Sequence, residues 1–434
     1  MLLIKGGKIL IGKFWRRANI LVNEQGLIVK IFRSEKINQF FASKVDTIYK
    51  AEGCLLLPGI VDMHVHFREP GFEYKEDFET GSKAAIAGGT TVVADMPNNK
   101  PRIKSLELLK KKKDRVEKKS YTDFLLYLEI PNDPTELNQL KQSDILPAGI
   151  KVYYYIEDEA RAFLQYPKPN EVLYIVHAED SLFIKKGESC ATYEDFESMR
   201  PKKAEIEAVK KALKLAENGL RIHITHVSTL ESLLEIINAK KRGLPVSMDV
   251  TIHHLLLTKK DGEKLKSIAK CFPPLRDEID RRSLVNGLSQ GYIDAITTDH
   301  APHSPEEKMM DLCNAPAGIA SIQYTLPLLF TFAKKIHVKD LGIIIKALSE
   351  RPARILSIRN RGKIKPGYYA DIIVFNHRRR WKILGEDGFS KAKLTPWEKM
   401  EVHGDVEATF LRGQLVYEGG EILKRVGKFL QPSV

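Results

Sequence analysis

Residues 59–66 read Gly59-Ile60-Val61-Asp62-Met63-His64-Val65-His66, an apolar run that carries two histidines two positions apart. A short apolar run of this kind is typical of a buried β-strand. Side chains on a strand alternate between its two faces, so His64 and His66 should project on the same side. Two imidazoles at the end of a strand can begin a transition-metal site, although histidines at this spacing are also common without a metal.

Seven more strand-like segments follow this one, and amphipathic helical segments separate most of them. Alternating strands and helices over a middle part of this length predict a TIM-like (β/α)8 barrel, with an open doubly wound sheet as the alternative. In such a barrel the first strand carries its histidines into the interior. The further expected strands are Thr90–Met96, Phe124–Ile130, Gly149–Ile156, Val172–His177, Arg221–His226, Val246–Ile252 and Asp294–Thr298.

The two ends of the chain differ from this middle part. Both consist of short strand-like runs separated by Gly and Asn turn signals, without the helical pattern. We therefore expect residues 58–358 to form the barrel, and residues 1–57 together with 359–434 to form one small β-sandwich domain. A large domain plus a small one suits a chain of 434 residues.

Polar residues with metal-binding chemistry occur at several of the expected strand ends. Lys151 lies in the fourth strand, His177 ends the fifth, His226 ends the sixth and Asp299 follows the eighth. Active sites of TIM barrels lie at the carboxyl ends of the strands. The agreement of these positions with the histidine pair of the first strand predicts a metal site at that end of the barrel.

Lys151 is an unusual member of this set, because a protonated lysine would repel metal ions. It lies in the apolar segment Gly149–Tyr153, where an unpaired charge would be costly to bury. The amine must therefore be deprotonated or modified next to a metal. Carbamylation by carbon dioxide would convert it to a carboxylate able to bridge two ions; an ordinary lysine paired with an acid is the alternative.

Several motifs resemble those of one known family. The segment Asp62-Met63-His64-Val65-His66-Phe67-Arg68-Glu69-Pro70-Gly71 resembles the signature of dihydroorotases of the amidohydrolase superfamily, as does Thr298-Asp299-His300-Ala301-Pro302-His303. Shorter matches are Met96-Pro97-Asn98, Val176-His177-Ala178-Glu179-Asp180, His223-Ile224-Thr225-His226-Val227-Ser228 and Pro273-Pro274-Leu275-Arg276. The resemblance covers nearly the whole chain.

The resemblance implies a centre of two metal ions, with zinc as the usual occupant. His64, His66 and Asp299 would bind the more buried ion, His177 and His226 the second, and carboxylated Lys151 would bridge both. The implied activity is the reversible hydrolysis of L-dihydroorotate to N-carbamoyl-L-aspartate in pyrimidine (UMP) biosynthesis. Asp299 would be the catalytic proton shuttle between the attacking hydroxide and the ring nitrogen; a role as ligand only is the alternative.

Substrate recognition should involve the carboxylate of dihydroorotate. Arg68 offers it a planar pair of donors, and a structural salt bridge with Glu69 or a neighbouring acid is the alternative for this side chain. Asn98 follows the second strand and can supply amide contacts. His303 lies shortly after Asp299 and can hold the same carboxylate.

One position departs from the family pattern. Family members usually carry a substrate-contacting asparagine before Pro-Pro-Leu-Arg, whereas this chain has Phe272 there. Phenylalanine has no side-chain donor or acceptor, so backbone groups must take over or the substrate preference has moved. His253 and His254, near the end of the seventh strand, are expected to support the site or the structure.

Two other classes of function remain open at this point. An allantoinase or a hydantoinase (dihydropyrimidinase) would hydrolyse related cyclic ureides with the same metal site; Asn98 favours dihydroorotase over allantoinase. A catalytically inactive relative could serve as an assembly subunit, for instance with aspartate transcarbamoylase. Such proteins lose metal ligands, and every expected ligand is present here.

The composition argues against nucleic-acid binding, membrane insertion and a disulfide-based fold. The net charge is +13, but the lysines are interleaved with acids, and the densest run, Lys110–Lys119, is expected to be the solvated face of a helix. We expect a small-molecule substrate, no nucleic acid and no membrane. A homo-oligomer stays open, and contact with aspartate transcarbamoylase rests on analogy alone. The four dispersed cysteines suggest neither a zinc ribbon nor a disulfide framework, which favours a reducing cytoplasm.

Overall fold

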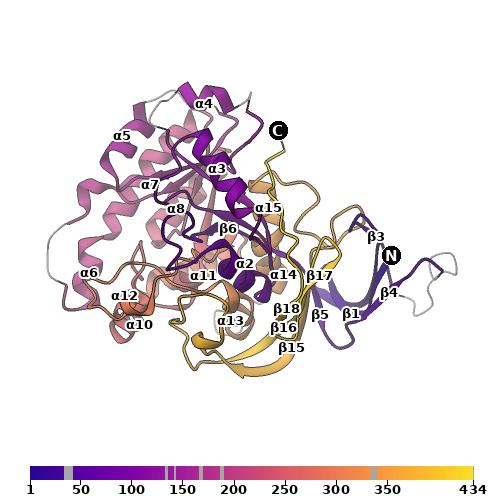
Figure 1. The fold of residues 1–434 in the computed structure, drawn as a ribbon. Coiled ribbons are helices and arrows are strands. Elements are labelled where there is room, and N and C mark those ends of the chain that lie inside the picture. Colours follow the sequence, from indigo (N-terminus) through magenta and orange to yellow (C-terminus); the bar gives the residue numbers. More distant parts are fainter. Residues whose placement is uncertain are drawn as a thin grey trace.

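The computed structural model describes residues 1–33, 43–131, 135–140, 143–165, 170–185, 190–333 and 340–433. Its larger part is a ring of parallel strands surrounded by helices, which confirms the predicted TIM-like barrel (Figure 1). Each of the eight expected barrel strands is present, within a few residues of its expected bounds. The strands are β6 (Ile60–Val65), β7 (Thr90–Asp95), β8 (Asp123–Leu126), β9 (Leu128–Glu129), β10 (Ile150–Tyr153), β11 (Leu173–His177), β12 (Arg221–Ile224), β13 (Val246–Thr251) and β14 (Ala295–Thr297).

The barrel strands form two hydrogen-bonded sheets, because the third expected strand is interrupted and contributes one half to each sheet. β6, β7 and β8 form the first sheet, and β9 to β14 form the second, with every pair parallel. β8 and β9 together correspond to the third expected strand, which is broken at Tyr127. A parallel bridge between Val65 and His300 joins β6 to the segment after β14. This bridge places the two ends of the predicted metal site next to each other.

The helices follow from apolar periodicity and from capping residues. In α7, Ala204, Ala208, Ala212 and Ala216 repeat every four residues, and all are buried. The helices are α2 (Phe78–Ala87), α3 (Leu106–Val116), α4 (Thr135–Gln139), α5 (Glu157–Gln165), α6 (Tyr193–Met199), α7 (Lys202–Glu217), α8 (Leu230–Lys241), α9 (Ile252–Leu256), α10 (Lys259–Leu265), α11 (Glu278–Ser289), α12 (Pro305–Lys308), α13 (Thr325–Phe332), α14 (Leu341–Ile345) and α15 (Arg351–Ile355).

Both ends of the chain form one nine-stranded sheet beside the barrel (Figure 1, indigo next to yellow). Its order is β18-β17-β16-β15-β5-β1-β2-β3, and β4 pairs with β1. The amino-terminal and carboxy-terminal segments meet where β5 and β15 pair antiparallel. The strands are β1 (Leu2–Ile11), β2 (Phe14–Val22), β3 (Ile28–Phe32), β4 (Thr47–Lys50), β5 (Leu55–Pro58), β15 (Ile372–Lys382), β16 (Glu401–Leu411), β17 (Gln414–Glu418) and β18 (Glu421–Ile422).

The barrel interior is apolar at the end opposite the expected site. Strand residues such as Val61, Val92 and Ile175 form an inner cluster, and Leu356 and Ile358 after α15 pack against it. The polar strand-end residues therefore lie at the other, carboxyl, end. Among the residues that the structure describes, no helix is long and apolar enough to cross a bilayer.

Candidate metal centre and active site

Three of the predicted ligands touch one another directly. Asp299 Oδ1 lies 3.3 Å from His64 Nε2 and 3.0 Å from His66 Nε2. All three side chains are buried, and their donor atoms lie within 4.8 Å of one another. Burial raises the pKa of Asp299, but the two neighbouring histidines outweigh it and hold the pKa far below the ordinary value. Asp299 is therefore an anion poised between two imidazoles.

The histidines of the fifth and sixth barrel strands complete a cluster of four rings. The ring centroids of His177 and His226 are 4.4 Å apart, and those of His226 and His64 are 5.3 Å apart. Burial lowers the pKa of His177 to about 4 and holds that of His226 well below its ordinary value. Neutral imidazoles are the form that binds metal ions, so His177 and His226 are in the competent state.

Lys151 projects from β10 into the same space. Its side chain is fully buried, and within the described part of the chain its Nζ has no hydrogen-bond partner. Burial lowers the pKa of Lys151 to about 8, which favours the neutral amine that reacts with carbon dioxide. His64 Nδ1 and His226 Nδ1 are also buried and have no partner among the residues that the structure describes. Unsatisfied polar atoms gathered in one place fit a group that is to be bound there.

Backbone strain marks the same positions. Arg68, His226 and Asp299 have φ angles of 64°, 41° and 44°, in the left-handed region that non-glycine residues rarely adopt. Such conformations cost of order 1 kcal/mol each and cluster at functional sites. The peptide N–H of His226 donates to Asp249 Oδ1 at 2.8 Å, which holds this strained residue in place.

Arg68 and His303, both predicted to bind a substrate carboxylate, lie side by side. Arg68 Nη2 is 3.1 Å from His303 Nε2, and Arg68 Nε donates to the Pro302 carbonyl. Lys75 Nζ donates to the other ring nitrogen of His303 at 3.2 Å. Glu69 is not the partner of Arg68; instead it accepts from Arg115 and Lys119, at 2.8 Å and 2.7 Å. The structure therefore does not pair Arg68 with Glu69; the acids that interact with Arg68 most strongly are Asp299 and Asp95, and its role in substrate binding stays a prediction.

Asn98, the third predicted substrate contact, lies against a predicted ligand. Its Oδ1 accepts a hydrogen bond from His66 Nδ1 at 2.7 Å, which leaves Nε2 of His66 directed toward Asp299. Asn98 thus fixes the tautomer and orientation of His66. A contact with substrate stays a prediction for this residue.

Several supporting side chains were not identified from the sequence. Glu179 Oε2 lies 2.7 Å from His177 Nε2, and Arg200 donates to both oxygens of Glu179. Beneath the cluster, Asp62 accepts from the hydroxyl of Thr298 at 2.5 Å. Glu179 stands two residues after His177 in a motif that resembles the family, and this spacing was the available signal.

The lysine-rich run contains one buried member. Lys112 on α3 is fully buried, and its Nζ donates to Asp95 Oδ2 at 2.5 Å and to Asn99 Oδ1 at 2.8 Å. Asp95 Oδ1 in turn accepts from the peptide N–H of Phe67. The expectation that the whole run is solvated is therefore wrong for Lys112, which supports the loop that follows the histidine pair.

His253 and His254 occupy different environments. His254 Nδ1 is 2.7 Å from the hydroxyl of Thr251, and its Nε2 donates to the Pro273 carbonyl. Both nitrogens of His253 are buried without a partner among the described residues. The donor atoms of the two histidines and Cys271 lie within 4.8 Å of one another. Because both nitrogens of His254 already have partners, its environment agrees with the structural role expected for it.

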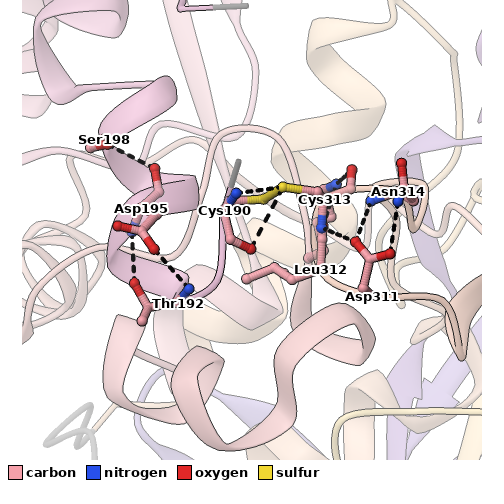
Figure 2. The surroundings of a disulfide bond; sticks show 9 residues. Cys190, Thr192, Asp195, Ser198, Asp311, Leu312, Cys313 and Asn314 are labelled. Carbon is pink, nitrogen blue, oxygen red and sulfur yellow. Dashed lines mark hydrogen bonds between the residues drawn. A yellow bond between two sulfur atoms is a disulfide. The ribbon is translucent and has the colours of Figure 1, made fainter. Parts of the chain in front are cut away.

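A disulfide joins two loops on the site side of the barrel. Cys190 precedes α6, and Cys313 lies in the loop after α12; the bond spans 123 positions (Figure 2). Figure 2 shows the flanking turn in which Asp311 accepts from the peptide N–H groups of Cys313 and Asn314. The expectation of no disulfide was wrong, because pairing between such distant cysteines leaves no signal in their spacing.

Fold and site together define a class: a β/α barrel with a polar, metal-competent cluster at the carboxyl ends of its strands. The amidohydrolase family model matches residues 55–416. A dihydroorotase from Pyrococcus abyssi is 37% identical over 422 residues, covering 96% of each chain. One from Staphylococcus epidermidis is 35% identical over 433 residues, covering 96% of this chain and 99% of the relative.

Solved structures agree on the fold. An L-hydantoinase (dihydropyrimidinase) from Arthrobacter aurescens superposes with a TM-score of 0.89 at 24% identity, covering 99% of both chains. A D-hydantoinase (dihydropyrimidinase) from a Thermus species gives 0.86 at 25% identity, covering 100% of this chain and 99% of that one. The chain therefore belongs to the amidohydrolase family and, within it, to the group of the dihydroorotases.

Proposed function

We propose that this protein is a dihydroorotase, a metal-dependent hydrolase that opens the cyclic amide of L-dihydroorotate to N-carbamoyl-L-aspartate and catalyses the reverse reaction. The observation that carries the proposal is the position of Arg68, a buried cation beside His303 and near the anionic Asp299. A ring that bears a carboxylate would bind to Arg68 while its amide faces the ligand cluster. The similarity to dihydroorotases along almost the whole chain supports the same substrate.

The residues present fit a centre of two divalent cations, for which we propose zinc. His64, His66 and Asp299 would hold one ion, and His177 and His226 the other. The amine of Lys151, buried and unpartnered, supports its carboxylation and a bridging role. A ligand set that combines histidine nitrogens with carboxylate oxygens suits zinc.

Side chains of this protein move the proton and orient the substrate in the proposed reaction. When bound, two cations would lower the pKa of a water between them and polarise a carbonyl. Asp299 accepts the proton from the attacking water and returns it to the ring nitrogen as the amide bond breaks. Arg68 and His303 hold the substrate carboxylate, so that the ring carbonyl is presented to the ligand cluster. The strained backbone at Asp299 fixes its carboxylate before substrate arrives.

A second candidate is a hydantoinase or dihydropyrimidinase activity. The chain shares its fold with solved hydantoinases, which is the observation that favours this second activity. Phe272, which replaces an amide by an apolar ring, also changes the expected lining of the substrate pocket. Substrates without a carboxylate would gain nothing from Arg68, which favours dihydroorotate.

Dihydroorotate and dihydrouracil provide the test, because they differ only in the carboxylate. We expect purified enzyme with two equivalents of metal to prefer dihydroorotate over dihydrouracil, hydantoin and allantoin in kcat/KM. Arg68→Gln should lower kcat/KM for dihydroorotate by about 10- to 100-fold, since a charged hydrogen bond contributes about 1.5–3 kcal/mol, and leave dihydrouracil turnover little changed. A wild-type preference for dihydrouracil would contradict the assignment.

The setting of the enzyme follows from this role. We place it in pyrimidine biosynthesis in the cytoplasm. A homo-oligomer, or contact with aspartate transcarbamoylase, would serve transfer of carbamoyl aspartate. We also propose that residues 58–358 form the catalytic domain, and that residues 1–57 with 359–434 form the smaller one.

A further inference from the structure

Phe272 stacks on a buried arginine. The Arg200 guanidinium carbon lies 3.8 Å from the centroid of the Phe272 ring. The ring of Phe196 stacks on Phe272 at 6.0 Å and an interplanar angle of 28°, which limits its rotation. A guanidinium flat on an aromatic face gains a cation–π attraction that grows when water is excluded.

Arg200 is enclosed by aromatic rings and one carboxylate. The ring of Tyr155 lies 5.2 Å from the Arg200 guanidinium carbon. Nε and Nη2 of Arg200 donate to the two oxygens of Glu179, at distances between 2.5 Å and 3.2 Å. Arg200 and Glu179 are both buried, so the planar guanidinium has a single orientation in which it fits both the ring and the carboxylate.

Glu179 transmits this orientation to His177. Its Oε2, the atom closest to Arg200 Nη2, accepts a hydrogen bond from His177 Nε2 at 2.7 Å. The imidazole is thereby fixed with Nδ1 as its free nitrogen, and the ring packs 4.4 Å from that of His226. Carboxylates that hold a ligand histidine in this way set both its tautomer and its basicity.

We propose that Phe272 is a positioning residue for His177, acting through Arg200 and Glu179. The ring holds the guanidinium in plane, the guanidinium holds the carboxylate, and the carboxylate aims the imidazole at the metal-competent cluster. An asparagine at this position could not stack on the guanidinium in the same way. The inference rests on the proposed role of His177 as a metal ligand.

Metal affinity tests the chain of contacts independently of turnover. We would strip the full-length protein of metal and measure binding of Co²⁺ and Zn²⁺ by competition with a chelating dye, together with the visible spectrum of bound Co²⁺. Phe272→Leu should weaken one of two equivalents by about 2- to 30-fold, the range between an exposed and a desolvated cation–π contact. Glu179→Gln should weaken it by about 10- to 100-fold, and Phe272→Tyr, which keeps the ring, should bind like wild type.

A double-mutant cycle separates transmission from general damage. In the Glu179→Gln background, Phe272→Leu should have little further effect, because the chain is already broken. Tyr369→Leu is the matched control: it removes a ring 4.5 Å from the guanidinium of Arg361, outside the ligand cluster, and should leave metal affinity unchanged. Phe272→Met is the substitute if the leucine variant unfolds.

The outcomes distinguish this inference from the proposed function. If His177→Ala still binds two equivalents, the proposed metal centre fails and the inference fails with it. If His177→Ala loses one equivalent while Phe272→Leu keeps wild-type affinity and spectrum, only the inference is overturned. An additive effect of Phe272 and Glu179 substitutions would also overturn it.

Discussion

The two halves of the ligand cluster are built differently. His64, His66 and Asp299, from the first and last barrel strands, contact one another directly through Asp299 Oδ1. Among the described residues, the first half keeps one buried nitrogen without a partner, Nδ1 of His64. In the other half, Lys151 has no partner for its only side-chain nitrogen, and His226 has none for Nδ1. His177 has a partner, but Glu179 reaches it from outside the cluster.

From this contrast we infer that the two halves depend on bound metal to different degrees. A carboxylate between two imidazoles satisfies part of their hydrogen-bonding capacity in the free protein. An unpartnered buried amine satisfies none, and its burial costs stability until something binds it. We expect substitutions in the first half to act mainly on catalysis and substitutions in the second half to act on metal binding and stability.

The largest effect is expected at Asp299. Asp299→Ala should lower turnover of dihydroorotate by at least about 10⁴-fold, because it removes both a proton shuttle and a ligand. Steady-state kinetics measure this loss. Asp294→Ala is the control, since Asp294 lies at the opposite end of β14, paired with Lys240. Retained turnover in Asp299→Ala would show that another group moves the proton.

Two buried lysines test the stability part of the comparison. Lys112→Met should destabilise the protein by about 3–5 kcal/mol, because it leaves the buried Asp95 without its cation. Lys151→Met should stabilise the metal-free protein by about 1–3 kcal/mol, because its amine has no partner to lose. Denaturant unfolding of both variants measures the change in the free energy of unfolding, which should be opposite in sign for the two. A metal-free Lys151→Met less stable than wild type would contradict the inference that the buried amine of Lys151 costs stability.

The barrel and the outline of the site were predictable from sequence for a physical reason. Strand periodicity and the positions of polar residues at strand ends are local signals, and barrel topology brings those ends together. Arg68 and His303, far apart in sequence, were placed at one substrate and do lie side by side. Their roles, and those of the six predicted ligands, stay predictions.

What the sequence could not provide are pairings between distant side chains. Lys112 looks like its solvated neighbours in a basic run, and only the packing of α3 places it on Asp95. From the sequence, Phe272 could be interpreted only as the loss of an asparagine side chain. Its contact with Arg200 could not be foreseen, because Arg200 lies 72 positions away in the chain. The Cys190–Cys313 bond is equally invisible to spacing. Each is a tertiary contact without a local pattern.

That disulfide connects the two halves, since Cys190 follows β11 and Cys313 follows β14. Cys190→Ala with Cys313→Ala should lower the free energy of unfolding by about 2–4 kcal/mol, mainly by releasing a long loop in the unfolded chain. Unfolding with and without reductant measures this difference. Cys54→Ala is the control, because Cys54 is a free cysteine just before β5, and reductant should affect that variant as it affects wild type.

The smallest effect concerns two glutamates whose pKa values are both about 2. Burial raises the pKa of Glu179, but Arg200 and His177 outweigh it; hydrogen bonds from Arg281 and Arg282 lower the pKa of the partly exposed Glu278. Because each pKa lies below its ordinary value, each contribution to stability is complete above about pH 4.5 and is lost as the pH falls toward 2.

Burial should decide which of these two contributions is measurable. In chelator, the stability difference between wild type and Glu179→Gln should shrink on acidification by up to about 1.4 kcal/mol per pH unit, the limit for one proton. The difference for Glu278→Gln should stay below about 0.5 kcal/mol at every pH, since water screens a surface pair. Urea unfolding between pH 2.5 and pH 6 provides both curves. Equal curves would mean that the Arg200–Glu179 pair is no stronger than a surface contact, and that the second half of the cluster lacks the rigid support we assign to it.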